Sequence, residues 1–245
     1  MLNLACILSQ SLKKMLGTNT KNLWFRILFS LLATGFFTPQ ATALTVAKSD
    51  ILLHIVSQCL DPSKENYCSQ CMLPRGDTHC GDMAQCKQTN EVWAFNPDYA
   101  AIRDIKMCGC SADFVHGLAI PRDIVTGVED SNRQEGIWEF AWGVAIERIE
   151  ADSIALVVNP KSQRTQNQLH IHLVRLDKNA RILFAQYLPV YVDNLKHIWS
   201  IAERDARAKG MNEYGVLVAQ SSTGKYMVVV TANSPESAFT QWSCN

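Results

Sequence analysis

The stretch SIALVVNPKSQRTQNQLHIHLVRL, residues 153–176, decides the fold of this chain. It joins an apolar run, SIALVVN (153–159), to a polar loop, PKSQRTQN (160–167), and an alternating segment, QLHIHLVRL (168–176). The apolar run is typical of an interior strand that is covered on both faces. The alternation predicts a second strand, because strand side chains point to opposite faces in turn. Together the two segments predict a hairpin with a long loop.

The alternation places His170 and His172 on one face of their strand, while Ile171 and Leu173 face the core. The loop before them offers hydrogen-bond donors and positive charge that suit a phosphate group. These loop residues are Lys161, Ser162, Arg164, Thr165, Gln166 and Asn167. A neutral imidazole can attack phosphorus directly and form a covalent intermediate, with neighbouring donors stabilising the oxygens. The pattern therefore indicates phosphoryl or nucleotidyl chemistry, and the alternative is a pair of purely structural histidines.

The flanking segments define the fold class. Before the hairpin, the sequence predicts a short amphipathic helix (49–60), a strand (114–121) with a following turn, and the longest helix (132–150). After it come a strand pair or extended stretch (181–192), a helix (195–210) and a second hairpin (214–232), with Gly224 in its turn. This order predicts an α+β fold with a mainly antiparallel sheet.

The N-terminus has the pattern of an export signal. Lys21 and Arg26 precede the apolar run ILFSLLATGFF (27–37), which is shorter than the about 20 residues of a membrane-spanning helix, and Ala41-Thr42-Ala43 forms an A-x-A site. We expect a signal peptide over residues 1–43 that is cleaved after Ala43, followed by one domain over 44–245. An uncleaved membrane anchor is the alternative. The formal net charge is zero, and no dense basic face attracts nucleic acid.

Cysteine usage agrees with export. Apart from Cys6 in the signal, the chain has eight cysteines, an even number that favours disulfides in an oxidising compartment. They are Cys59, Cys68, Cys71, Cys80, Cys86, Cys108, Cys110 and Cys244. Most of them lie in an irregular segment, about 59–112, that has little periodic apolar surface and needs crosslinks. The alternative is a zinc site that uses Cys68, Cys71, Cys108 and Cys110, with His79 nearby.

The strand, loop and strand ALVVNPKSQRTQNQLHIHL resemble the signature of the histidine triad (HIT-like) superfamily. More narrowly, RTQN followed by the H-x-H pair resembles the bacterial CDP-diacylglycerol pyrophosphatase family. The QCL helix, the FVHGLAIP strand and the EYGVLVAQSSTGKYMVVVTA hairpin also fit that family. The resemblance covers most of residues 49–60 and 113–235.

The resemblance implies an enzyme that hydrolyses CDP-diacylglycerol to CMP and phosphatidate without a metal or cofactor, acting on a CDP-lipid at a membrane surface. It would lie in the periplasm or on the periplasmic face of the inner membrane. His170 matches the nucleophile that holds the CMP group, and His172 matches the histidine that hydrogen-bonds the phosphate. The residues that match substrate-binding positions are Asn159, Arg164, Thr165, Gln166 and Asn167, and we also expect Gln168 among the substrate-binding residues.

The chain departs from the triad at Gln168, where the first histidine would stand. A glutamine leaves its backbone carbonyl available to orient His170 Nδ1, but its side chain cannot carry a proton. The cysteine-rich segment is also longer than the family pattern. Two alternatives therefore stay open, a HIT-like hydrolase of another nucleotide diphosphate compound and an inactive, disulfide-stapled binding protein.

Other candidate residues carry weaker signals. His116 could face the site from its strand, although a structural role is the simpler expectation, and His79 and His197 have no supporting neighbours. Trp138 and Trp142 are expected in the core or at a membrane interface rather than in a base-stacking pair. Glu147 and Glu150 are expected to lie on a solvated helix face.

Overall fold

The computed structural model describes residues 48–60 and 91–244, which belong to one compact unit, Ala47–Asn245. The predicted signal segment (1–43) lies outside the described residues. Other predicted features outside them are His79, Cys68, Cys71, Cys80 and Cys86, and the side chain of Cys59. Within the described ranges, no helix is both long and apolar enough to cross a membrane.

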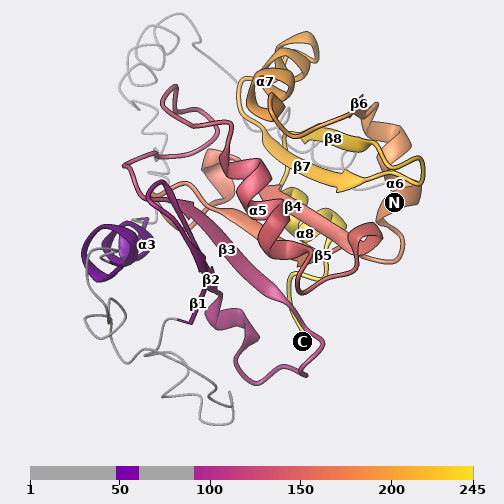
Figure 1. Ribbon diagram of the computed structural model, residues 1–245. Helices are drawn as coiled ribbons and strands as arrows, with labels where there is room; N and C mark the ends of the chain where they lie inside the picture. The colour runs from indigo at the N-terminus through magenta and orange to yellow at the C-terminus, as the bar shows by residue number, and fades with distance from the viewer. Residues whose placement is uncertain (1–47, 61–90, 245) are drawn as a thin grey trace, which may run out of the picture. The chain divides into compact units, whose positions relative to one another are not determined.

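An eight-stranded sheet forms the centre of this unit, in the order β1-β2-β3-β5-β4-β7-β8-β6 (Figure 1). Every neighbouring pair is antiparallel. The strands are β1 (Val92–Phe95), β2 (Tyr99–Arg103), β3 (His116–Pro121), β4 (Ile154–Val158), β5 (Ile171–Arg175), β6 (Val190–Val192), β7 (Gly215–Gln220) and β8 (Tyr226–Thr231). The predicted α+β class with an antiparallel sheet is confirmed.

Five α-helices accompany the sheet in the described part of the chain. They are α3 (Ile51–His54), α5 (Ile137–Ala145), α6 (Ala180–Phe184), α7 (Ile198–Ala208) and α8 (Pro235–Phe239). A π-helical turn, η2 (Ile55–Cys59), continues α3, and single 3₁₀ turns occur at η4 (Ile105–Met107), η5 (Ala151–Ser153), η6 (Lys161–Gln163) and η7 (Ala185–Tyr187).

The two faces of the sheet are covered by different helices. Helices α5 and α7 pack on one face, where Trp138 and Trp199 join a core that includes Leu156. The opposite face carries two separate apolar clusters, which strand alternation places there. One cluster joins α6 and α8 to β4, β7 and β8 through residues such as Val157, and the other joins α3 and η2 to β2 and β3. Trp138 and Trp142 are therefore core residues, which was one of the two expected locations, the core and a membrane interface.

The histidine strand lies between these two clusters. Across four neighbouring strands, Ile102 pairs with Leu118, Leu118 with His172, and His172 with Val157. Paired residues lie on the same face of a sheet. The same face therefore changes from apolar side chains on β2 and β3 to imidazoles on β5, and then to the apolar cluster on β4 and β7.

Both predicted hairpins are confirmed. Strands β4 and β5 pair in antiparallel fashion around the long loop 159–170, and β7 pairs with β8. Gly224 has φ +81° in the second turn, in the left-handed region that glycine enters without steric cost.

The expectation of a strand pair or extended stretch at 181–192 was wrong over its first half. Ala180 and Phe184 are four residues apart and both are buried, so the segment gains its apolar contacts as helix α6. Only Val190–Val192 forms a strand, β6.

The helix expected over 132–150 is shorter than expected, and it is not the longest. Helix α5 covers Ile137–Ala145, whereas α7 covers 11 residues. The carboxylate of Glu135, which precedes α5, accepts hydrogen bonds from the Trp199 and Ser200 amides at the start of α7, at 2.8 and 3.0 Å. Unpaired amides at a helix start attract a carboxylate in this way. Glu147 and Glu150 are exposed, as expected.

The irregular segment expected over about 59–112 was also partly wrong, since its described portion contains β1, β2 and η4. Sequence inspection missed β2, YAAIR, because all five residues are buried and the strand lacks alternation.

Candidate functional site

His170 immediately precedes β5, and a backbone carbonyl fixes its orientation. Its Nδ1 is 2.8 Å from the oxygen of Gln168, and the side chain is 8% exposed. A carbonyl oxygen can only accept a hydrogen bond, so Nδ1 must carry the ring proton. In the neutral ring the lone pair is then on Nε2. The sequence predicted this orientation, in which the backbone carbonyl of Gln168 holds Nδ1 of His170.

Burial lowers the pKa of His170 from its ordinary value, and the Gln168 carbonyl, Glu236 and Asp104 oppose this shift. An imidazole whose pKa is lowered stays neutral near pH 7 and keeps its lone pair. His170 therefore has the protonation state of a nucleophile.

His172 and His116 form a second pair of imidazoles beside His170. His172 Nδ1 is 2.9 Å from Nε2 of His116, which β3 contributes. Burial lowers the pKa of His172 well below its ordinary value, and the imidazoles of His170 and His116 add to the effect. Burial and the Lys106 charge lower the pKa of His116 to about 3. The structure thus brings into the site a histidine, His116, for which the sequence favoured a structural role.

Two carboxyl groups approach the His116–His172 pair. Asp104 Oδ2 is 3.6 Å from His116 Nε2, and Glu236 Oε1 is 3.5 Å from the same nitrogen and 3.4 Å from His172 Nδ1. Burial raises the pKa of Asp104. Lys106 Nζ contacts Glu236 Oε1 at 2.6 Å. Together the five side chains form a charged network next to His170.

Sequence inspection missed Asp104, Lys106 and Glu236. The first two follow β2, which has no alternating pattern. Glu236 follows Ser234 and Pro235, and this order of N-cap and first-turn proline is a helix-start signal. That signal could have located α8, but it could not have shown that the helix meets β3 and β5.

Asn159 at the end of β4 joins this network. Its Nδ2 donates to Glu236 Oε2 at 2.6 Å, and its Oδ1 accepts from Ser234 Oγ at 2.7 Å. Asn159 was expected near the nucleotide, and the structure places it in the cavity wall, where it also positions Glu236.

The predicted phosphate-binding loop divides between the cavity and structural contacts. Thr165 and Gln166 line the cavity. Arg164 lines it too, but both terminal nitrogens of its guanidinium bind Glu129, at 2.8 and 2.6 Å. Asn167 is not among the lining residues, and its Nδ2 donates to Asp50 at 2.6 Å.

Gln168, expected among the substrate-binding residues, does not line the cavity and is a buried structural residue. Its Nε2 donates to the carbonyls of Pro121 and Asp123, at 2.9 and 2.7 Å, and its Oε1 accepts from the Val125 amide at 3.3 Å. These bonds hold the turn after β3 against the histidine strand. The Gln168 side chain, at the position where the resemblance places the first triad histidine, therefore makes structural contacts, while its carbonyl orients His170.

A cavity of about 600 Å³ opens over the histidines and has two different halves. The polar half comes from β5, its preceding loop, the end of β4 and α8. The apolar half comes from α3, η2, β2, η4, β3 and the C-terminal tail, and the same stretch of β2 and η4 also contributes Arg103, Asp104 and Lys106 to the lining. The apolar side chains are Ile51, Leu52, Ile55, Ile102, Ile105, Leu118 and Trp242. About 300–1,000 Å³ is typical of a pocket for a small organic ligand.

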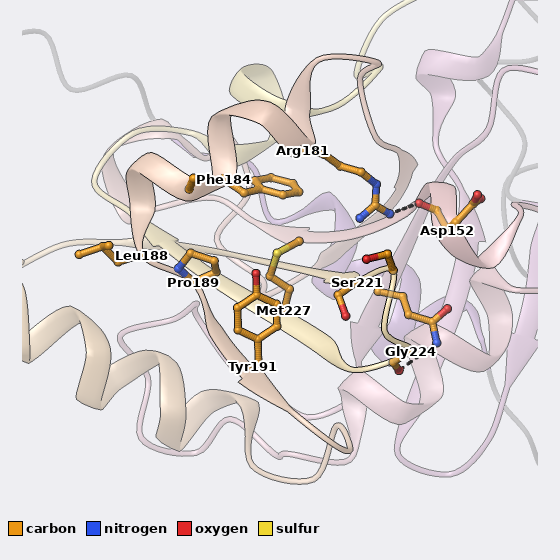
Figure 2. Close-up of a pocket in the computed structure, with 12 residues that line it drawn as sticks. Asp152, Arg181, Phe184, Leu188, Pro189, Tyr191, Ser221, Gly224 and Met227 are labelled. Atoms are coloured by element: carbon orange, nitrogen blue, oxygen red, sulfur yellow. Dashed lines mark hydrogen bonds between the residues drawn. The ribbon is translucent and has the colours of Figure 1, made fainter.

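A larger cavity, about 890 Å³, lies between the α6–η7–β6 segment and the β7–β8 hairpin (Figure 2). Its walls include Phe184, Leu188 and Met227, and Arg181 donates to the backbone carbonyl of Asp152 at its side. None of the lining residues is a histidine or cysteine. Although this cavity is larger than the one over the histidines, it lacks those side chains, and we do not assign it as the catalytic site.

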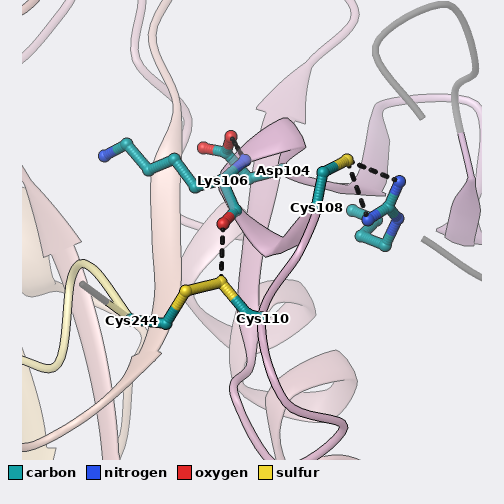
Figure 3. The surroundings of a disulfide bond; sticks show 6 residues. Asp104, Lys106, Cys108, Cys110 and Cys244 are labelled. Carbon is teal, nitrogen blue, oxygen red and sulfur yellow. Dashed lines mark hydrogen bonds between the residues drawn. A yellow bond between two sulfur atoms is a disulfide. The ribbon is translucent and has the colours of Figure 1, made fainter. Parts of the chain in front are cut away.

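A disulfide joins Cys110 to Cys244 and ties the C-terminal tail to the segment that follows η4 (Figure 3). Cys110 Sγ lies 3.1 Å from the Lys106 carbonyl. Cys108 is disulfide-bonded as well. Neither thiol of the C-x-C pair is then free, which removes two ligands from the alternative zinc site.

Asp104, His116 and His172 could in principle hold a metal, since one ligand atom from each lies within 4.8 Å of the others. The ammonium group of Lys106 lies close by, bound to Glu236, and repels a second cation. We assign no metal to this group. Of the remaining histidines, His54 and His197 are exposed and outside the cavity lining.

Comparison with protein families gives one match. The model of the CDH family, described as CDP-diacylglycerol pyrophosphatase, matches residues 47–201. A search of curated proteins finds no match. The matched range includes His116, His170, His172 and the whole loop between β4 and β5, and it covers more than half of the chain. The chain is therefore a member of the CDP-diacylglycerol pyrophosphatase family, a family of hydrolases.

Proposed function

We propose that this protein hydrolyses CDP-diacylglycerol to CMP and phosphatidate, with His170 as the nucleophile. The family supports the hydrolase activity and the substrate. The observation that supports the covalent step is the hydrogen bond from His170 Nδ1 to the Gln168 carbonyl, which leaves Nε2 unprotonated in a cavity wall.

In the first step, Nε2 of His170 attacks the phosphorus atom that carries cytidine. A P–N bond forms, and the P–O bond to the bridging oxygen breaks. That oxygen leaves with its electron pair as phosphatidate. In the second step, a water oxygen attacks the same phosphorus, the P–N bond breaks, and CMP and one proton are released.

The leaving group explains why a glutamine at position 168 is compatible with this reaction. Phosphatidate leaves as a phosphate monoester, whose second pKa is about 6, so the bridging oxygen does not need a proton from an acid near pH 7. The side chain at position 168 is then free for the structural contacts that Gln168 makes.

His172 acts as a hydrogen-bond donor to the phosphate. Oxygens of Asp104 and Glu236 lie 3.5–3.6 Å from His116 Nε2 and favour a proton on that nitrogen. If His116 Nε2 carries its ring proton, it donates to His172 Nδ1, 2.9 Å away, and the His172 proton is then on Nε2. This buried Nε2 has no hydrogen-bond partner among the described residues, so an incoming oxygen would satisfy it.

Positive charge at the cavity suits the pyrophosphate group. Arg164 is held by Glu129, and Lys106, with its side chain 36% exposed, is held by Glu236. Both cations are kept at the cavity by these carboxylates, and each can interact with phosphate oxygens there. Thr165 and Gln166 supply uncharged polar groups beside them.

We further propose that the protein is exported and works in the periplasm or on the periplasmic face of the inner membrane. The pattern of residues 1–43 supports export. The Cys110–Cys244 disulfide is compatible with an oxidising compartment.

The test measures CMP release from CDP-diacylglycerol in the presence of a chelator. The wild type should release CMP, and His170→Ala should reduce the rate at least 1,000-fold, roughly the loss seen when a nucleophile is removed. His197→Ala is the matched control and should leave the rate unchanged, since His197 is exposed and outside the cavity lining. Turnover of His170→Ala at the wild-type rate would contradict the mechanism, and an inactive wild type would favour the alternative of a binding protein.

A further inference from the structure

The apolar half of the catalytic cavity begins next to the catalytic strand. Leu118 pairs with His172 on one side and with Ile102 on the other. Neighbouring strands are about 4.8 Å apart, so Leu118 lies one strand from His172 and Ile102 lies two strands away. A ligand held by the imidazoles therefore meets hydrocarbon side chains within one strand spacing, on one side only.

This apolar half has a buried floor and an exposed rim. The floor consists of Leu52, Ile102 and Leu118, which are 3–6% exposed. The rim consists of Ile51, Ile105 and Trp242, which are 54%, 56% and 44% exposed. Three of the large apolar side chains that the described chain exposes thus gather at the mouth of one cavity. Such a grouping marks a binding surface, whereas single exposed apolar residues do not.

The boundary between the two halves carries a positive charge. Lys106 follows Ile105 in η4, contacts Glu236 on the polar side, and lies 5.4 Å from the centre of the Trp242 ring on the apolar side. A ligand that fits a polar site, then a positive charge, then an apolar surface has an anionic group joined to a hydrocarbon portion. Phosphatidate has this structure.

We propose that the apolar half of the cavity binds the acyl-glycerol portion of the lipid substrate, with Ile51, Ile105 and Trp242 contacting the membrane surface. This inference rests on the proposed function and deepens it by locating the lipid. A cavity of about 600 Å³ is of the size that holds one small organic ligand. It receives the headgroup, the glycerol and the first methylene groups, while the distal parts of the acyl chains stay in the bilayer.

The kinetic test compares two substrates that differ only in the acyl chains. CDP-diacylglycerol in mixed micelles and water-soluble CDP-glycerol are hydrolysed by wild type, Ile105→Asp and Ile182→Asp. The measured quantity is the ratio of kcat/KM for the lipid to kcat/KM for CDP-glycerol. We expect this ratio to fall about tenfold or more in Ile105→Asp, since losing the burial of one isoleucine removes that much affinity.

Ile182→Asp is the matched control. Ile182 is 74% exposed on α6 and does not line the catalytic cavity, so the same change there should leave the ratio as in the wild type. An unchanged ratio in Ile105→Asp, or an equal fall in both variants, would overturn the lipid subsite.

A binding measurement separates this inference from the proposed reaction. Dihexanoyl phosphatidate is titrated by calorimetry into the same three proteins, with no hydrolysis involved. We expect Ile105→Asp to bind about tenfold more weakly than wild type and Ile182→Asp to bind as wild type does. If no substrate is hydrolysed, the proposed function fails and this titration alone decides about the subsite. Absence of phosphatidate binding to the wild type, or equal binding by Ile105→Asp, would overturn it.

Discussion

At the scale of single residues, one backbone carbonyl sets the tautomer of His170. The Gln168 oxygen accepts from Nδ1, and the proton cannot move to Nε2 without losing that bond. Burial keeps the ring neutral, because a buried imidazolium would lose its hydration. Tautomer and charge state are thus both set by the folded chain before any substrate binds.

The lowered pKa of His170 predicts the pH dependence of hydrolysis. Protonation removes the lone pair, so activity is lost as the pH falls through the pKa of the folded state, which is below the ordinary value of about 6.5. We expect the acid limb of kcat/KM for CDP-glycerol to be centred below pH 6.5. An acid limb centred above pH 6.5 would contradict the neutral, buried imidazole.

Gln168 allows a test of whether a titrating side chain is accepted behind His170. Gln168→His should not raise the rate of CMP release, and it should lower the free energy of unfolding by about 1–3 kcal/mol, because the backbone groups of Pro121, Asp123 and Val125 lose partners. Urea denaturation and the CMP-release assay measure the two effects. A variant that is as stable as wild type and also faster would show that a titrating side chain is accepted there.

At the scale of elements, a disulfide assembles part of the cavity wall. The Cys110–Cys244 bond holds the tail that carries Trp242 next to the segment that carries Ile105 and Lys106. Neither the tail nor the segment after η4 belongs to a strand of the sheet. The crosslink adds to the few backbone hydrogen bonds that hold these two segments, such as Gln241 N to Arg175 O at 2.9 Å.

Removing this bond should affect both stability and activity. We expect Cys110→Ser to lower the free energy of unfolding by about 2–4 kcal/mol, a typical value for a native disulfide, and to lower kcat/KM for CDP-diacylglycerol because Trp242 and Lys106 lose their fixed positions. Denaturation curves and kinetics measure this. Cys110→Ser/Cys244→Ser should match the single variant, since both lack the same bond. Wild-type kinetics in both variants would show that the tail needs no crosslink.

The elements also show what the sequence could and could not predict. The apolar run 153–159, the alternation 168–176 and the turn at Gly224 predicted two hairpins, because strand periodicity is local information. Residues 181–192 were misassigned, since a short apolar run suits a strand or a buried helix equally well. Strand β2 was missed because both of its faces are buried.

The distinction between local sequence information and long-range contacts also applies to the site. His170 and its carbonyl partner are two residues apart, so alternation and a motif located them together. Asp104, His116 and Glu236 come from three separate segments that meet only through sheet pairing and the position of α8. No spacing in the sequence encodes such a contact, and the alternatives for His116 therefore stayed open.

At the scale of the whole molecule, the sheet separates the two kinds of chemistry that a phospholipid requires. His170, His172, Asn159 and Glu236 line the cavity from β5, β4 and α8. The hydrocarbon side chains of Ile102 and Leu118 lie over β2 and β3, and Arg103, Asp104 and Lys106 add charge at the end of β2 and in η4. Both parts use the same face, and helices α5 and α7 close the other face with a continuous core. The larger cavity beside β6 has no histidine among its lining residues. The side chains that line a cavity, and not its volume, therefore distinguish the candidate site.

Burying neutral histidines also predicts how the whole molecule responds to acid. His116 has a pKa of about 3 when folded and about 6.5 when unfolded, so between these values the unfolded chain binds more protons. The free energy of unfolding should therefore fall as the pH drops from about 6.5 toward 3 and should not change through His116 above that range. Urea denaturation at pH 7, 5 and 4 measures the slope.

His116→Asn is the comparison that isolates this contribution, because carboxyl groups titrate in the same pH range. The variant should be less stable than wild type at pH 7, and its stability should depend less on pH between 7 and 4. Parallel curves for the two proteins would contradict a neutral, buried His116.

The most direct test of the central claim is to trap the covalent intermediate. Wild-type protein is mixed with CDP-diacylglycerol, quenched in alkali within milliseconds, digested, and analysed by mass spectrometry. We predict that the mass of one cytidylyl group is added to the peptide that contains His170, and that no peptide of His170→Ala carries it. Rapid CMP release with no adduct on any peptide, or an adduct on a residue other than His170, would contradict the account.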